Sequence, residues 1–185
     1  MKYRLAEDAH PQVKLLLLAT LITAVLWFLP YAEFLVYPVR LFVTFIHEGG
    51  HVLASLVTGG SVQSLTVAPD GSGMVQSLTN SRLSVLITSS AGYLGAIAYG
   101  TLLLVLIRRA YSARIVLAVS AAFVGLMTVV FGLLAPLWHL FRADVSPGSV
   151  LFTIISGAAL TLGLLAIAKY ASAWWANFTL AFLAV

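Results

Sequence analysis

Residues 41–60 read LFVTFIHEGGHVLASLVTGG. In this apolar stretch His47 and His51 stand four positions apart, and Glu48 directly follows the first histidine. The run predicts a helix that ends at the glycine pair 59–60, because glycine commonly follows the last turn of a helix. Residues i and i+4 of a helix lie one above the other on the same face, so both imidazoles can reach one metal ion. The carboxylate of Glu48 would then lie beside that ion.

This spacing is typical of a catalytic zinc site, with two nitrogen ligands and a carboxylate that takes a proton from water. We therefore predict His47 and His51 as zinc ligands and Glu48 as the catalytic base. The structural alternative is a set of buried side chains that neighbouring groups satisfy, which is a fair interpretation of a lone histidine. Three ionisable side chains at membrane depth are unfavourable unless they bind something or line a wet cavity, so a functional site is favoured.

The composition indicates a membrane protein. The chain has 185 residues, of which 61% are hydrophobic and 9% charged, and its mean hydropathy is +1.03. Soluble domains carry about 25% charged residues. We expect one membrane-embedded domain over residues 1–185 in contact with the lipid bilayer. Because there is no cysteine, disulfides and cysteine-ligated zinc are excluded.

The net charge of +4 comes from ten Lys and Arg residues that are scattered over the segment ends. This scatter favours contacts with the membrane interface, and we expect no nucleic-acid partner. The basic residues divide evenly between the two sides of a six-segment topology, so the positive-inside rule assigns no orientation.

The order of apolar segments predicts an all-α integral membrane protein with about six transmembrane helices and a small β-hairpin after the second helix. The apolar segments are residues 13–29, 34–57, 83–107, 115–140 and 150–168, followed by a final run after Lys169. We expect a kink at Pro136. The third segment is rich in small residues and should pack against the motif helix. The final run is too short to span about 30 Å, so we expect either a half-inserted helix or a chain that is truncated at Val185.

Residues 61–79 alternate apolar and polar side chains around the turn 69–73, PDGSG, which predicts two strands. This hairpin is either a simple connector or an edge strand that pairs with an extended substrate by β-addition.

Catalytic zinc normally has three protein ligands and a water molecule. A third histidine of the metzincin kind is excluded, because Ala54 and Val57 stand at the positions of its glycine and histidine. A downstream glutamate is excluded because none follows Glu48. The remaining candidates are Asp70, Asp144, His139 or a residue beyond Val185. Asp70 is more simply explained as a turn former and His139 as an interfacial residue.

Three stretches together resemble the site-2 protease family of intramembrane zinc metallopeptidases, in its short bacterial branch. They are His47-Glu48-Gly49-Gly50-His51, Thr58-Gly59-Gly60 before the hairpin, and Ser90-Ala91-Gly92-Tyr93-Leu94-Gly95 in the next helix. The resemblance covers about residues 40–107. It implies His47 and His51 as zinc ligands, Glu48 as the base, and a bacterial inner membrane location. The chain departs from the family at Gly49, where leucine is common, and in lacking a late Asp-Gly ligand element.

We therefore predict a zinc-dependent intramembrane endopeptidase whose substrate is a membrane protein or transmembrane peptide. We expect Gly49 and Gly50 to let backbone or substrate approach the metal. The first alternative is a catalytically inactive membrane scaffold or regulator of the same fold. A weaker alternative is a metal-ion transporter, which would need a second intramembrane polar cluster.

Overall fold

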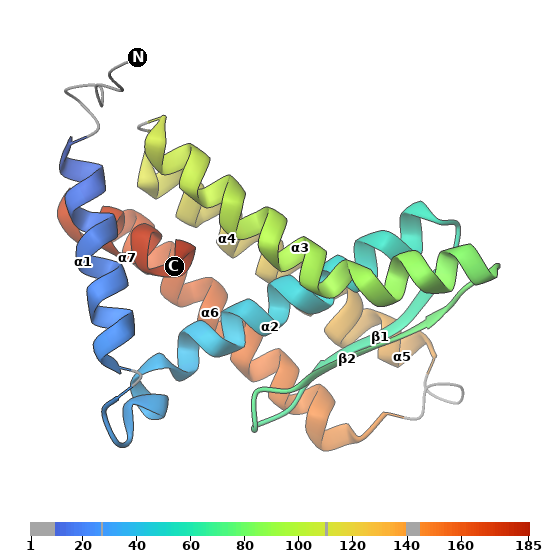
Figure 1. Ribbon diagram of the computed structural model, residues 1–185. Helices are drawn as coiled ribbons and strands as arrows, with labels where there is room; N and C mark the ends of the chain where they lie inside the picture. The colour runs from blue at the N-terminus through green and yellow to red at the C-terminus, as the bar shows by residue number, and fades with distance from the viewer. Residues whose placement is uncertain (1–9, 27, 110, 140–144) are drawn as a thin grey trace, which may run out of the picture.

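The computed structural model describes residues 10–26, 28–109, 111–139 and 145–185. These residues form a mostly helical bundle with one two-stranded antiparallel sheet (Figure 1). The elements are α1 His10–Leu26, α2 Ala32–Val57, β1 Ser61–Val67, β2 Gly73–Leu78, α3 Arg82–Arg108, α4 Ala113–Leu126, η2 Met127–Leu134, α5 Ala135–Trp138, α6 Pro147–Tyr170 and α7 Ala173–Ala184.

Three helices are long and apolar enough to cross a membrane. They are Arg82–Arg108, the continuous helix Ala113–Trp138 that joins α4, η2 and α5, and Pro147–Tyr170. α1 and α7 are apolar but shorter, and α2 carries the charged motif within its 26 residues. The prediction of a helical membrane protein with a hairpin is therefore confirmed. In the described part of the chain, however, three helices and not about six are both long enough and apolar enough to cross a membrane.

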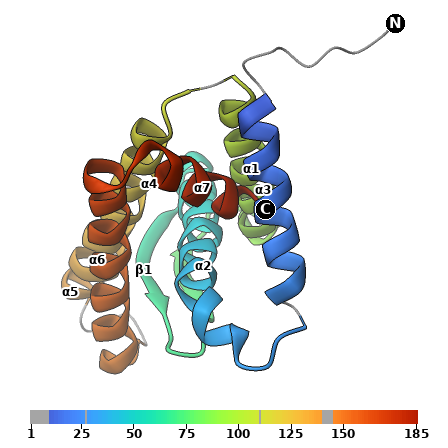
Figure 2. The same cartoon turned by 90° about the vertical axis from the view of Figure 1, so that its left-hand side faces the viewer.

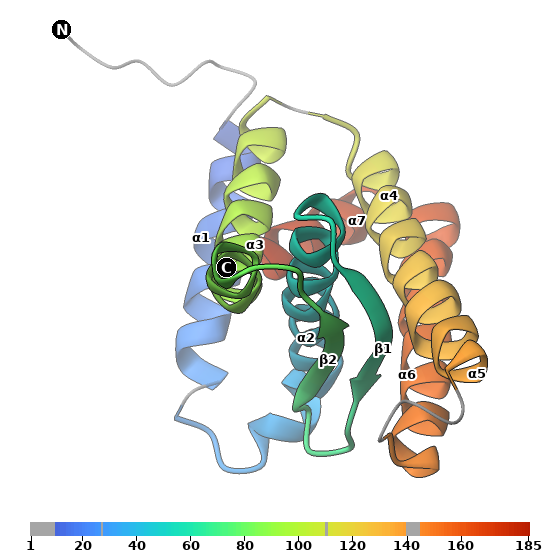
Figure 3. The ribbon, with the colours of Figure 1, turned by 90° about the vertical axis from the view of Figure 1, so that its right-hand side faces the viewer.

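α2 occupies the middle of the bundle. In Figures 2 and 3, α1 and α3 lie on one side of α2, while α4 and α6 lie on the other; α7 crosses in front of α2 in Figure 2 and behind it in Figure 3. The predicted packing of the third segment against the motif helix is confirmed, since α3 contacts α2 more extensively than any other helix does.

The sequence of α2 explains this central position. Its buried residues recur every three or four positions, which gives the helix one continuous packed face. They are Leu41, Phe42, Phe45, Ile46, Glu48, Gly49, Val52 and Ser55. The helix ends as predicted: the Thr58 N–H donates to Ala54 O at 3.0 Å, and Gly59 follows with a φ of +78°.

The hairpin packs beside α2, and its two strands differ in how deeply they are buried. β1 is buried, with Leu65 and Val67 at 0% exposure, whereas β2 is half-buried or exposed. β1 is fixed from the other side by Thr153 of α6, whose hydroxyl accepts the Val67 N–H at 2.7 Å. β2 therefore forms the open side of the sheet, next to α2 and the start of α3 (Figure 3).

The helix of the fourth apolar segment is irregular directly before Pro136, where a kink was expected. Eight residues form a π-helix, Met127–Leu134, directly before the short α5 that holds Pro136 near its first residue. Because proline has no N–H to donate, the hydrogen-bond ladder must be interrupted upstream of it, and a wider turn accommodates the interruption.

Candidate metal centre

The two motif histidines converge, as the helical spacing predicts. Nε2 of His47 lies 3.2 Å from Nε2 of His51, and the ring centroids are 4.9 Å apart at an interplanar angle of 74°. Nδ1 of His51 lies 2.6 Å from Thr88 O. Because a carbonyl oxygen only accepts, Nδ1 carries the proton and Nε2 presents a lone pair to the space between the rings.

Gly92 of α3 closes that space from the opposite helix. A Cβ built on Gly92 would overlap Nε2 of both His47 and His51. It would therefore occupy the volume that an atom bound to both nitrogens would take. The backbones of the two helices come close here, as shown by Gly50, where an added Cβ would strike Ala91 O.

The side chain of Glu48 extends from α2 toward the beginning of β2. Its side chain is 5% exposed, and a Cβ at Gly73 would lie 2.5 Å from Oε1 of Glu48. The first residue of β2 thus has to be small for the Glu48 carboxylate to fit beside the histidines.

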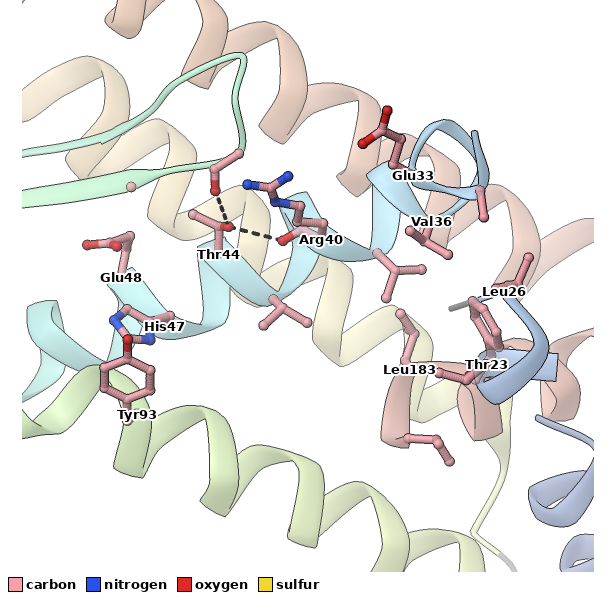
Figure 4. Close-up of a pocket in the computed structure, with 17 residues that line it drawn as sticks. Thr23, Leu26, Glu33, Val36, Arg40, Thr44, His47, Glu48, Tyr93 and Leu183 are labelled. Atoms are coloured by element: carbon pink, nitrogen blue, oxygen red, sulfur yellow. Dashed lines mark hydrogen bonds between the residues drawn. The ribbon is translucent and has the colours of Figure 1, made fainter. Parts of the chain in front are cut away.

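Two cavities meet at this cluster. The larger, of about 830 Å³, is lined mainly by apolar residues of α1, α2 and α7. Figure 4 shows His47 and Glu48 at one end of it, with Thr23, Leu26 and Leu183 at the other. The smaller, of about 400 Å³, lies between α2, β2 and the start of α3. His47 and Glu48 line both cavities, so the cluster is accessible from two sides.

Tyr93 forms part of the wall of the larger cavity. Its ring stands nearly perpendicular to the His47 ring, at 88°, with the centroids 4.7 Å apart. Figure 4 shows the Tyr93 side chain extending from α3 to the His47 ring. It therefore limits the positions that the His47 imidazole can take.

The donor set fits a divalent metal such as zinc. Two ligands at about 2.1 Å from a tetrahedral ion stand roughly 3.4 Å apart, close to the 3.2 Å between the two Nε2 atoms. The Thr88 carbonyl supplies the outer contact that usually orients a metal-ligating histidine. The missing Cβ of Gly92 leaves the required volume open.

Among the described residues, no third His, Cys, Asp or Glu joins the pair. Asp70 lies in the hairpin turn, where its Oδ1 accepts Ser72 N–H at 2.9 Å and Ser72 Oγ–H at 2.6 Å. These hydrogen bonds, assisted by the charge of Arg40, hold the pKa of Asp70 below its usual range. Asp70 is therefore a turn former here. His139 caps the end of α5, away from the pair, and Asp144 falls outside the described residues.

The two motif glycines have different surroundings. The expectation for Gly50 is supported by its close approach to the α3 backbone. The expectation for Gly49 is wrong, because Gly49 faces α4 and not the histidines. A Cβ at Gly49 would lie 2.6 Å from Cζ of Phe123.

Two residues of the cluster are not among the predicted site residues: Thr88, and Gly92, which belongs to the small residues of the third segment and to the family resemblance. Their spacing of four residues places them on one face of α3, but this spacing alone does not show that the face meets α2.

A family model described as Peptidase M50B-like matches residues 18–185. No curated protein matches the chain, and no solved structure does. The family match spans the motif helix, the hairpin and all the helices that follow. The chain therefore belongs to the Peptidase M50B-like family, which is part of the site-2 protease family.

Proposed function

We propose that this protein is a zinc-dependent endopeptidase that hydrolyses a peptide bond in or near the membrane. The observation that carries the proposal is the convergence of the two Nε2 atoms, 3.2 Å apart, beside the buried Glu48. The peptidase family and the apolar spanning helices support the same assignment.

Each residue of the cluster has a distinct task. Zinc held by His47 and His51 would act as a Lewis acid on the peptide carbonyl and would activate water. Glu48 takes a proton from the attacking water and passes it to the leaving amine nitrogen. Thr88 O keeps the proton of His51 on Nδ1, so that Nε2 stays available as a ligand.

The cavities support a membrane protein or transmembrane peptide as substrate. The larger cavity offers an apolar surface that reaches the cluster from α1 and α7. The smaller cavity brings β2 residues Gly73, Met74 and Val75 next to the same histidines. β2 pairs with β1 on one edge only, within the part of the chain that the structure describes. We infer that an unwound substrate segment adds to its other edge and thereby enters the site extended.

The decisive experiment compares the wild type with His47→Ala and Glu48→Gln, purified in detergent. We expect about one zinc per wild-type chain, none in His47→Ala, and an undiminished content in Glu48→Gln. Cleavage of a membrane-peptide substrate should fall at least 100-fold in Glu48→Gln, because general acid–base catalysis contributes about 10²–10⁴.

The alternatives give different results. An inactive scaffold or regulator would keep its cellular role in Glu48→Gln, whereas a protease would lose it. A wild-type protein that binds no zinc when the metal is supplied would contradict the proposal.

Strand addition has its own test, because the chain contains no cysteine. A single cysteine in place of Met74, which is 49% exposed on β2, should cross-link to a cysteine near the scissile bond of substrate trapped by Glu48→Gln. The control is a cysteine in place of Leu83, which is 65% exposed and lines neither cavity. Equal cross-linking at both positions would contradict strand addition.

A further inference from the structure

One end of the bundle carries only positive charge among the described residues. At this end, here called the cationic end, α3 leads to α4 and α6 leads to α7; in Figures 2 and 3 both connections lie opposite the hairpin turn. Its basic residues are Arg108, Arg109, Arg114 and Lys169. The three acidic residues that the structure describes lie on α2 or in the hairpin turn: Glu33, Glu48 and Asp70. The cationic end therefore attracts anions.

A small cavity opens at this end, between the segment 111–114 and α7. Its volume is about 230 Å³, or roughly eight water molecules at 30 Å³ each. The polar side chains that line it can all donate hydrogen bonds: Tyr111, Ser112, Arg114 and Asn177. The hydroxyl of Ser112 makes no cap hydrogen bond to α4 and is available to a ligand.

Arg114 is held in place for such a ligand. Its Nη2 donates to Ala171 O at 2.8 Å, which ties the start of α4 to the α6–α7 connection. The guanidinium has five N–H donors in a fixed plane, so one bond orients it and leaves the others for a phosphate group.

The aromatic residues near the cavity are of the kind that favours the level of lipid headgroups. Exposed tyrosine and tryptophan side chains favour the membrane interface, where one end of the ring is apolar and the other is wet. Four of them lie on the two connections or next to them: Tyr111 at 56% exposure, Tyr170 at 76%, Trp174 at 48% and Trp175 at 56%.

We propose that the cationic end binds the headgroup of an anionic phospholipid, with the phosphodiester in the cavity beside Arg114. Arg108, Arg109 and Lys169 supply the surrounding positive potential, and the exposed aromatic rings pack against the glycerol and upper acyl chains. This site is separate from the histidine cluster and does not depend on hydrolysis. Basic pockets between membrane helices are a known setting for lipid headgroups.

The test uses the full chain in neutral detergent and measures its thermal midpoint. Added phosphatidylglycerol should raise the midpoint by about 5 °C at saturation, because a ligand that binds only the folded state stabilises it. Phosphatidylcholine, whose headgroup has no net charge, should have little effect. The shift should shrink as salt is raised from 50 to 500 mM, because exposed charges are screened.

Matched variants locate the effect. Arg114→Gln and Arg109→Gln should each lose at least half of the shift, measured from their own lipid-free midpoints. Arg82→Gln makes the same charge change at the other end of α3 and should keep the full shift. Equal losses in all three variants, or equal shifts with both lipids, would overturn the proposal. A shift produced equally by soluble glycerol phosphate would also overturn it, because the site would then hold a free anion and not a lipid.

Discussion

Replacing Gly92 with alanine should weaken zinc binding although both histidines are kept. The new methyl group would overlap both Nε2 atoms, and each nitrogen would have to retreat by about 1 Å to reach ordinary van der Waals contact. Metal–ligand distances tolerate only about 0.2 Å. A displacement of this size should weaken zinc binding at least 100-fold, or about 2.7 kcal/mol. Alanine is a better helix former than glycine by about 1 kcal/mol, so α3 itself should not unfold.

The assay is a zinc titration of the metal-free protein against a chromophoric competing chelator. Gly100→Ala is the matched control, since it lies on the same helix and its Cβ would meet nothing within 4 Å. We expect Gly100→Ala to bind zinc as the wild type does. If Gly92→Ala binds zinc within threefold of the wild type, the two imidazoles do not share an ion in front of Gly92, and the site described above is wrong.

Three further predictions follow from contacts around the site and the hairpin. Gly73→Ala should push the Glu48 carboxylate from its place and lower cleavage about 100-fold with zinc content unchanged; full activity would show that β2 does not position the base. Thr153→Val leaves the buried Val67 N–H unpaired and should lower the free energy of unfolding by about 1–3 kcal/mol, measured in denaturant, whereas a loss below about 0.5 kcal/mol would mean that another acceptor replaces it. The depressed pKa of Asp70 predicts that its stabilisation of the turn is complete above the ordinary value of 3.8 and is lost as the pH falls through the lower folded value; hydrogen exchange of the hairpin amides across acidic pH should show this for the wild type and not for Asp70→Ala.

The helix and strand positions were predictable because the sequence marks them clearly. The glycine pair after Thr58 ends α2 where expected, and the turn around Asp70 places β1 and β2 within a few residues of their predicted bounds. Both depend on local backbone chemistry, which a short stretch of sequence contains. The convergence of His47 and His51 was predictable for the same reason, since it follows from helical spacing alone.

The partner side of the cluster was not predictable, because it depends on how α3 is rotated about its axis. α3 is apolar around its whole circumference, so its sequence does not show which face meets α2. Thr88 and Gly92 reach the histidines only because the helix packs with that face inward. The π-helical turns before Pro136 are a similar case, since the sequence indicates an interruption but not the form that it takes.

The backbone contact between α2 and α3 at Gly50 has a mechanical consequence. With no side chain between them at this point, the two helices should move as one rigid body, so that the imidazoles and the Thr88 carbonyl keep their spacing during any larger motion. α1 packs chiefly on α7, and the large cavity lies between it and α2. If a transmembrane helix enters this cavity from the bilayer, we therefore expect α1 to move outward while α2 and α3 keep their relative positions.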